Sequence, residues 1–347
     1  MAETRDLGDR RAKILRVLVS HYVRSGEPVG SKTLVERYNL GVSAATVRNE
    51  MAALEDAGFI YQPHTSAGRI PTDMGYRYFV DRWSNDSRLP EREAQQVKRF
   101  FGEPRWELED ALRQTASLLS TLTDHAAVVF APALDRSTVR HVELVALPME
   151  RAMVVLVTDT GRVENHVVRI PAGVDEVQLS QTAEMMNRAV VDTPLEQAPV
   201  KMVQELDRFP LEFREVVGAV ATSLAEELSH NEAQRVFLEG TSNIVDEHKF
   251  SDLETVRQVI QALEHRRLLL EVLADALSVE RVSVRIGAEN ALDAMQACTV
   301  ISAPYGADGS ALGSLGVVGP TRMDYRRSIA AVHEVAANLG RMLSGQD

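Results

Sequence analysis

Residues 43–51 read SAATVRNEM, and this stretch decides the predicted fold of the amino-terminal region. Ser43 is a residue type that begins helices, because its hydroxyl accepts a hydrogen bond from a free backbone amide of the first turn. Val47, Met51 and Leu54 then recur four and three residues apart, which places them on one face of a helix. The stretch therefore predicts a helix that begins at Ser43 and buries one apolar stripe.

The opposite face of this helix carries side chains that suit the major groove of DNA. Arginine forks onto guanine, asparagine onto adenine, threonine bonds a phosphate or touches a thymine methyl, and alanine permits close approach. Gly58 then ends the helix. The residues predicted to face DNA are Ser43, Ala45, Thr46, Arg48 and Asn49.

Two shorter patterns upstream complete a DNA-binding motif. Asp9 is predicted to cap a helix that Gly26 ends, and Ser31 to cap a second helix that runs to Tyr38. Residues 39–42 supply the turn into the third helix. This order predicts a helix-turn-helix, in which the last helix enters the major groove.

A two-stranded wing is predicted after the third helix. Residues 59–62 are strand-like, residues 63–68 form a turn, and Arg69 begins a return strand. Winged helices also serve as protein-docking modules, so the fold alone does not establish DNA binding. Arg48, Asn49 and Arg69 fall at positions predicted to be exposed, and this favours DNA binding over protein docking. The wing residues predicted to touch phosphate or the minor groove are His64, Thr65, Ser66 and Arg69.

Charge is distributed unevenly along the 347 residues. Residues 1–83 hold 12 Lys+Arg and 10 Asp+Glu, whereas the remainder holds 26 against 40, and the whole chain carries −12. Such an acidic bulk is repelled by phosphates, which argues against a protein that coats nucleic acid indiscriminately. Specific DNA binding by the mildly basic amino-terminal region is compatible with this charge distribution.

The single cysteine, Cys298, lies in an apolar run, so no intramolecular disulfide is possible and we interpret it as a buried core residue. The amino terminus lacks the apolar run of a signal peptide, and no window approaches the ~20 apolar residues of a membrane span. We expect a cytoplasmic protein that does not enter membranes.

The rest of the chain predicts a mixed α+β fold. A polar loop at 82–92 marks the first domain boundary. Helices are predicted at 95–123, with a break near Gly102, and the sequence at 177–277 is mainly helical. A closing helix is predicted at 325–343. The predicted strands are 126–132, then 139–147, 153–158 and 163–170, which form an antiparallel meander at 139–170, and then 282–286, 298–304 and 314–318.

A seven-residue apolar repeat lies near the end of the long helical region. A core helix is the more common explanation of such a stripe, and pairing across a dimer is the alternative. The residues that would form the dimerisation contact in this alternative are Leu253, Val256, Ile260, Leu263, Leu270 and Leu277.

Catalytic, metal and cofactor sites are not predicted. The glycines at 306–319 lack the Lys-Ser/Thr of a phosphate loop and fit hairpin turns and close strand packing better. None of the nine histidines pairs with another at metal-ligand spacing. No nucleophile elbow occurs. We therefore assign no catalytic residue and expect no enzyme, metal or cofactor.

Four sequence blocks, in order, closely resemble the family of heat-inducible transcription repressors HrcA. The blocks are Glu27–Lys32 (EPVGSK), Ser43–Met51, Thr65–Thr72 (TSAGRIPT) and Gly316–Tyr325 (GVVGPTRMDY). The resemblance implies a winged-helix domain, a GAF-like domain and an inserted dimerisation domain. It also implies a homodimer that represses chaperone operons at an inverted repeat in double-stranded DNA, and a chaperonin that keeps the repressor active.

The resemblance places the winged helix at 1–85, the GAF-like domain at 90–175 and 279–347, and the insertion at 176–278, with the 139–170 meander as a possible further part of the insertion. An inverted repeat requires a two-fold symmetric protein. Either the helices near 253–277 or the meander can supply the contact. A winged-helix regulator that senses a small molecule through its GAF-like domain is the alternative function.

Overall fold

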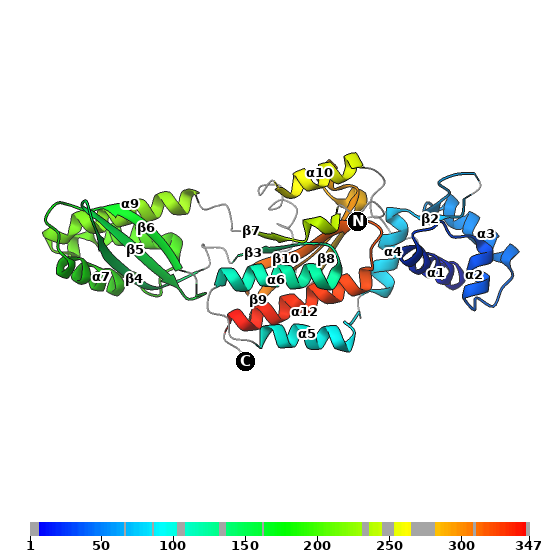
Figure 1. Cartoon of the computed structure of the whole chain (residues 1–347), viewed down its shortest axis with the longest axis horizontal. Coiled ribbons are helices and arrows are strands. Elements are labelled where there is room, and N and C mark those ends of the chain that lie inside the picture. Colours follow the sequence, from blue (N-terminus) through cyan, green and yellow to red (C-terminus); the bar gives the residue numbers. More distant parts are fainter. Residues whose placement is uncertain are drawn as a thin grey trace.

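The computed structural model describes residues 7–65, 67–84, 87–102, 108–131, 137–161, 163–230, 236–244, 253–264, 282–307 and 310–344. Over these residues the fold is α+β, with three separate sheets. Three lobes follow one another along the longest axis of the molecule (Figure 1). No helix among the described residues is both long and apolar enough to cross a membrane.

The amino-terminal lobe has the predicted order of three helices followed by two strands, which pair antiparallel. Gly8 and Gly30, rather than Asp9 and Ser31, occupy the N-cap positions of the first two helices, and neither helix has a side-chain cap. The elements are α1 (Asp9–Ser25), α2 (Ser31–Arg37), α3 (Ala44–Asp56), β1 (Ile60–Tyr61), β2 (Ile70–Pro71) and α4 (Asp73–Trp83).

Helix α4 was not predicted from the sequence. It begins at Thr72, whose hydroxyl accepts a hydrogen bond from the Gly75 amide at 3.2 Å. Tyr76, Tyr78 and Phe79 are buried within it. The buried side chains of α4 belong to one hydrophobic core that runs from α1 and α3 into the central lobe. Helix α4 therefore connects the first lobe to the second.

A five-stranded antiparallel sheet in the order β7-β3-β10-β9-β8 forms the central lobe. Its strands are β3 (Ala126–Phe130), β7 (Val236–Glu239), β8 (Ser283–Ile286), β9 (Cys298–Ala307) and β10 (Ser310–Pro320). Helices α6 (Leu108–Thr123) and α12 (Tyr325–Leu343) cover one face, with α5 (Glu91–Phe101) packed on α12. Helix α10 (Leu253–Glu264) covers the other face.

Close strand packing accounts for two of the glycines in the glycine-rich segment, as predicted. A Cβ atom at Gly316 would stand 2.5 Å from the carbonyl oxygen of Ile301 on the paired strand. A Cβ atom at Gly313 would overlap the Tyr305 hydroxyl. Only glycine fits at such approaches.

The distal lobe has a core of its own. The meander of β4 (Val139–Leu147), β5 (Arg151–Thr158) and β6 (Val163–Arg169) is antiparallel, as predicted, and packs against α7 (Glu176–Val190), α8 (Ala198–Gln204) and α9 (Leu211–His230). Short 3-10 segments are Leu195–Gln197, Leu206–Arg208, Thr241–Ile244, Gly287–Glu289 and Asp293–Met295.

The lobes do not follow the predicted bounds 90–175 and 176–278, and they match the alternative in which the 139–170 meander joins the inserted segment. Residues 139–169 belong to the distal lobe rather than to the central sheet, because their inward side chains share a core with α7–α9. Strand β7, inside the region expected to be helical, pairs with β3 and returns the chain to the central sheet. The segment that forms the distal lobe is thus inserted between β3 and β7 of the central sheet.

The seven-residue stripe also faces inward. Val256 is 6% exposed and Leu263 is 1% exposed, and Ile260 packs against the same core as Val128 and Val300 of the central sheet. Val256 and Leu263 are therefore core residues, and Ile260 is partly buried against the same core, so for these three the core-helix explanation holds and the dimer-contact alternative is corrected. Leu270 and Leu277, and the side chain of Leu253, lie outside the described residues.

Candidate nucleic-acid interface

Ser43 holds the first turn of α3. Its hydroxyl oxygen accepts a hydrogen bond from the Thr46 amide at 3.2 Å, and the two hydroxyl oxygens lie 3.0 Å apart. Ser43 is exposed, but its hydroxyl is engaged by the helix, and Thr46 is half-buried beside it. The cap therefore orients the end of α3 that was predicted to enter the groove.

Removing this cap should loosen α3. Ser43→Ala deletes the acceptor and should cost about 1 kcal/mol, whereas Ser43→Asn should retain most of the cap. We expect the α3 amides to exchange hydrogen about fivefold faster in the alanine variant, measured by hydrogen–deuterium exchange. Equal exchange in the alanine and asparagine variants would contradict a capping role.

The apolar stripe of α3 is buried as predicted. Val47 and Leu54 are fully buried and Met51 is 5% exposed, so this face packs on the core of the lobe. Arg48 and Asn49 are then exposed on the outer face. Within the part of the chain that the structure describes, neither side chain has a hydrogen bond or an ion pair. Both are thus available to a ligand outside the protein.

An ion pair fixes α3 against α1. The Arg11 Nε lies 2.7 Å from the Glu50 Oε2, and the Arg10 Nη1 lies 3.6 Å from the Glu50 Oε1. The hydrogen bond from Arg11 lowers the pKa of the Glu50 carboxyl below its usual value. Because Glu50 follows Asn49 directly, this contact sets the direction in which the exposed face points.

The two strands predicted for the wing pair as a short hairpin, and this hairpin with its loop is called the wing below. Ile60 pairs with Pro71 and Tyr61 with Ile70. Gln62 organises the loop, because its amide nitrogen donates to two loop carbonyl oxygens, those of Thr65 at 3.0 Å and Ala67 at 2.9 Å. His64 and Thr65 are exposed at the tip, and Ser66 lies outside the described residues.

Arg69 is more constrained than the sequence suggested. Its backbone exchanges two hydrogen bonds with Val29, each 2.9 Å long, which ties the base of the wing to the loop between α1 and α2. Its Nε lies 2.8 Å from the Glu55 Oε2, and its side chain is only 24% exposed. Arg69 was predicted at an exposed position, and it is half-buried instead.

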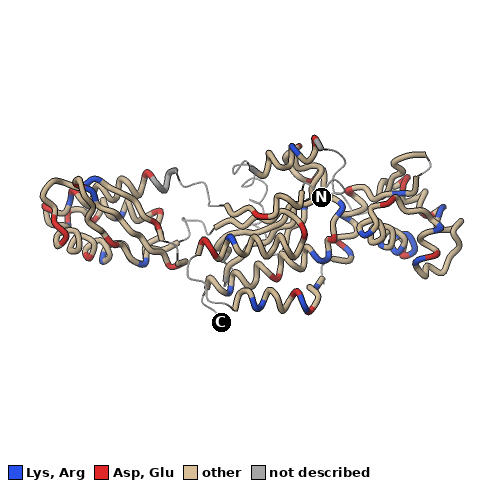
Figure 2. Tube along the Cα trace, in the orientation of Figure 1, with Lys and Arg blue, Asp and Glu red and all other residues tan. Residues whose placement is uncertain are grey.

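Lys32 was not among the predicted contacts, although it lies within one of the family-like blocks. It is exposed on the first turn of α2, and α2 packs against α3. Because the first helix of a helix-turn-helix commonly crosses the phosphate backbone, the position of Lys32 in the sequence could have marked it as a candidate phosphate contact. Figure 2 shows Lys and Arg distributed over the amino-terminal lobe.

Contacts between the first two lobes were also not predicted. The Arg77 guanidinium pairs with the Glu289 carboxylate and donates to the Val284 carbonyl oxygen at 2.5 Å. The Ala288 amide donates to the Asp73 carboxylate at 3.0 Å. These residues are more than 200 positions apart in the sequence. They hold α4, and with it the whole lobe, against the edge strand β8.

No group of three metal-ligand side chains occurs among the residues that the structure describes. Cys298 is fully buried, and desolvation raises the pKa of its thiol to about 12. The thiol is thus neutral near pH 7, which fits the predicted core role.

Comparison with known proteins identifies the family. The family model for the HrcA protein C-terminal domain matches residues 109–329. The chain is 44% identical over 337 residues to the heat-inducible transcription repressor HrcA of Nocardia farcinica, with 97% of each chain covered. It is 42% identical to the repressor of the same name from Mycolicibacterium smegmatis, with 97% of this chain and 98% of that protein covered.

A crystal structure of a hypothetical protein at 2.2 Å resolution superposes with a TM-score of 0.69 at 22% identity, over 99% of this chain and 100% of that one. This likeness concerns the fold alone. The sequence relationship extends over almost the full length of both relatives, through the amino-terminal lobe as well as the matched C-terminal region. The chain therefore belongs to the HrcA family of heat-inducible transcription repressors.

Proposed function

We propose that this chain represses transcription of chaperone operons by binding an inverted repeat near their promoters as a homodimer. The amino-terminal lobe acts as a winged helix-turn-helix, α3 enters the major groove, and the wing touches phosphate or the adjacent minor groove. Bound protein blocks the polymerase. The observation that supports this best is that Arg48 and Asn49 are exposed and have no partner among the described residues, on a helix held by the Ser43 cap and the Glu50–Arg11 ion pair.

A gel shift on the promoter region of the host's chaperonin operon tests the proposal. We expect a complex that survives an excess of random DNA fragments, because base contacts add to the phosphate contacts that all sequences offer. Equal competition by random fragments would contradict operator recognition.

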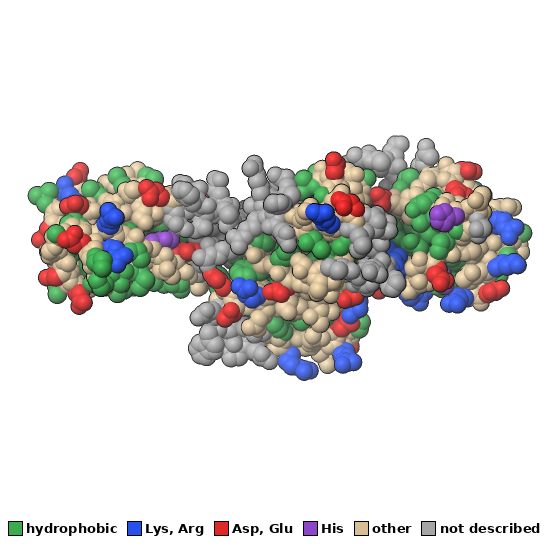
Figure 3. All heavy atoms as spheres, turned by 45° about the horizontal axis from the view of Figure 1, so that its top comes forward, with side chains coloured by type: hydrophobic (Ala, Val, Ile, Leu, Met, Phe, Trp, Pro, Cys, Tyr) green, Lys and Arg blue, Asp and Glu red, His purple; other side chains and the backbone are tan. Residues whose placement is uncertain are grey.

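The dimer surface is proposed to be the open face of the β4–β6 sheet. Helices α7–α9 cover the other face. On the open face Val145, Val163 and Val167 are 40%, 51% and 55% exposed, which is unusual for so many β-branched apolar side chains on one sheet. Hydrophobic side chains reach the surface of the distal lobe in Figure 3.

The strand register arranges this face as four rows across the sheet. The rows are Leu147–Arg151–Arg169, Val145–Met153–Val167, Glu143–Val155–Asn165 and His141–Val157–Val163. The Val145–Met153–Val167 row is apolar, as are Met153, Val155 and Val157 of the central strand, while Arg151 and Arg169 carry a charge opposite to that of Glu143, which lies 3.2 Å from His141. A second copy related by a two-fold axis can bury these apolar side chains and bring the opposite charges together, as an isologous interface requires.

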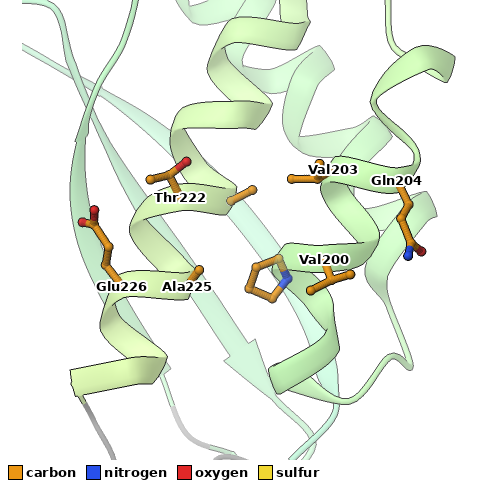
Figure 4. A pocket seen from close by; sticks show the side chains of 8 residues that line it. Val200, Val203, Gln204, Thr222, Ala225 and Glu226 are labelled. Atoms are coloured by element: carbon orange, nitrogen blue, oxygen red, sulfur yellow. The ribbon is translucent and has the colours of Figure 1, made fainter.

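The chaperonin is proposed to contact a second apolar surface of the same lobe. Val200 and Val203 of α8 and Ala225 of α9 line a pocket of about 570 Å³ between the two helices (Figure 4). Val200 is 58% and Val203 57% exposed. Such exposed apolar patches mark protein-interaction sites. In a gel shift with added chaperonin, Val203→Asp should abolish the change in operator binding and leave binding without chaperonin intact.

Arg69 is proposed to contact phosphate from the base of the wing. Arg69→Ala should then lower the slope of log K against log salt by about one for each copy on the DNA. Glu55→Gln is the matched variant, because it releases the same guanidinium and removes a negative charge, and it should raise the affinity. Gel shifts at several salt concentrations measure both, and an unchanged slope in Arg69→Ala would exclude the contact.

We further propose that the central lobe is the GAF-like domain. Its sheet is packed on both faces by hydrophobic side chains among the described residues. This packing favours a filled core over the alternative function, in which the GAF-like domain holds a small molecule in a pocket.

A further inference from the structure

A polar cleft of about 610 Å³ lies between the amino-terminal and central lobes. The first lobe contributes α1, the base of the wing and the start of α4 to its walls, and the central lobe contributes the segments before β9 and after β10. The side chains that matter here are Tyr22, Tyr61, Tyr76, Gln296 and Arg322. The cleft therefore combines aromatic rings, an amide and a cation from two lobes.

Tyr76 is the most informative of these residues. It is 3% exposed, and its ring packs against that of Tyr325 with the centroids 5.5 Å apart. The Tyr325 hydroxyl is satisfied, because it donates to the Thr321 carbonyl oxygen at 2.6 Å. Among the described residues the Tyr76 hydroxyl has no hydrogen-bond partner. The hydroxyl is not one of the fully enclosed polar atoms, so it opens into the cleft, where a ligand can accept its hydrogen bond.

Arg322 supplies the positive charge of the cleft. Its guanidinium lies over Gly26, so closely that a Cβ atom there would stand 2.8 Å from Nη1, and Gly26 has a φ of +71°. Burial raises the pKa of Tyr76 and of Tyr22, while the positive charge of Arg322 acts to lower both, so the cation lies near both phenols. Both phenols remain neutral donors near pH 7. The Asp73 carboxylate, also in the cleft, is engaged by the Ala288 amide.

We propose that this cleft binds a planar aromatic anion, whose ring packs against the tyrosines and whose carboxylate or phosphate pairs with Arg322 and accepts a hydrogen bond from Tyr76. Arginine recognises both anionic groups by paired hydrogen bonds. A ligand that bridges the two lobes stabilises the arrangement in which both walls are present. Tyr61 and Ile70 form a pair at the base of the wing, and both line the cleft. Such a ligand therefore also fixes the wing relative to the central lobe.

Isothermal titration of the full chain without DNA tests this proposal independently of the repressor role. The probes are benzoate and adenosine 5′-monophosphate, which represent the two sources of an aromatic anion, with inorganic phosphate and neutral benzamide as comparisons. We expect at least one aromatic anion to bind at least tenfold more tightly than phosphate and benzamide. Equal binding of phosphate, or no binding of either aromatic anion at millimolar concentration, overturns the proposal.

Two pairs of variants locate the binding. Tyr76→Phe keeps the ring and removes the hydroxyl, and should weaken binding about five- to tenfold. Tyr78→Phe on the same helix removes a buried hydroxyl that also lacks a partner but lies outside the cleft, and should have no effect. Arg322→Gln should weaken binding at least tenfold, whereas Arg326→Gln, an exposed arginine outside the cleft, should not. Unchanged binding in Tyr76→Phe and Arg322→Gln overturns the site.

Discussion

Val167→Asp is expected to convert the proposed dimer into a monomer and to lower affinity for the proposed inverted-repeat operator about a thousandfold or more. Val167 lies in an apolar row of the open sheet face and is 55% exposed. In an isologous interface the new carboxylate is buried twice without a partner, at a cost of several kcal/mol for each copy. Since 1.4 kcal/mol is a factor of ten, dissociation follows, and the gain from two linked half-sites is lost.

Analytical ultracentrifugation and gel shifts measure this result. Affinity for a single half-site should be unchanged, because α3 and the wing are in another lobe. Val177→Asp is the matched control: Val177 is 64% exposed in the first turn of α7, off the sheet face, where a negative charge is well tolerated. A Val167→Asp protein that stays dimeric would show that a different surface joins the copies, with the α8–α9 pocket as the next to test.

Arg48→Ala is expected to weaken operator binding by about 1 to 3 kcal/mol at each half-site, roughly tenfold to more than a hundredfold, and to relax the preference for one base. Arg48 is exposed on α3 with its apolar stripe fixed beneath it, so the substitution removes a contact to DNA without disturbing the core. Gel shifts against operators that vary one base pair at a time measure both effects.

Arg92→Ala, an exposed arginine on α5 in the central lobe, is the control for the loss of one positive charge and should leave binding almost unchanged. If Arg48→Ala weakens all sequences equally, Arg48 contacts phosphate instead of a base. Base reading would then rest on Asn49 and the other groove-facing residues.

Local sequence signals predicted the elements whose stability is decided within a few residues. Ser43 could be identified as a cap, and Val47, Met51 and Leu54 as the buried face of α3, because both features depend only on helical spacing. Helix α4 was missed because its run of Tyr76, Tyr78, Phe79 and Val80 is rich in residues typical of strands. Its helical form depends on packing against α1 and the central lobe.

By itself, the sequence determined the three-helix order of the first lobe, the two short strands of the wing, the antiparallel meander, the closing helix and membership of the family. Only the tertiary structure decided that the meander belongs to a separate core and that the stripe at Val256 and Leu263 faces inward. It also decided that Glu55 pairs with Arg69 and that a cleft forms beside Arg322. The physical reason is sequence separation. Caps and helical faces arise among near neighbours, whereas sheet partners, ion pairs and clefts join segments that are far apart along the chain and meet only after folding.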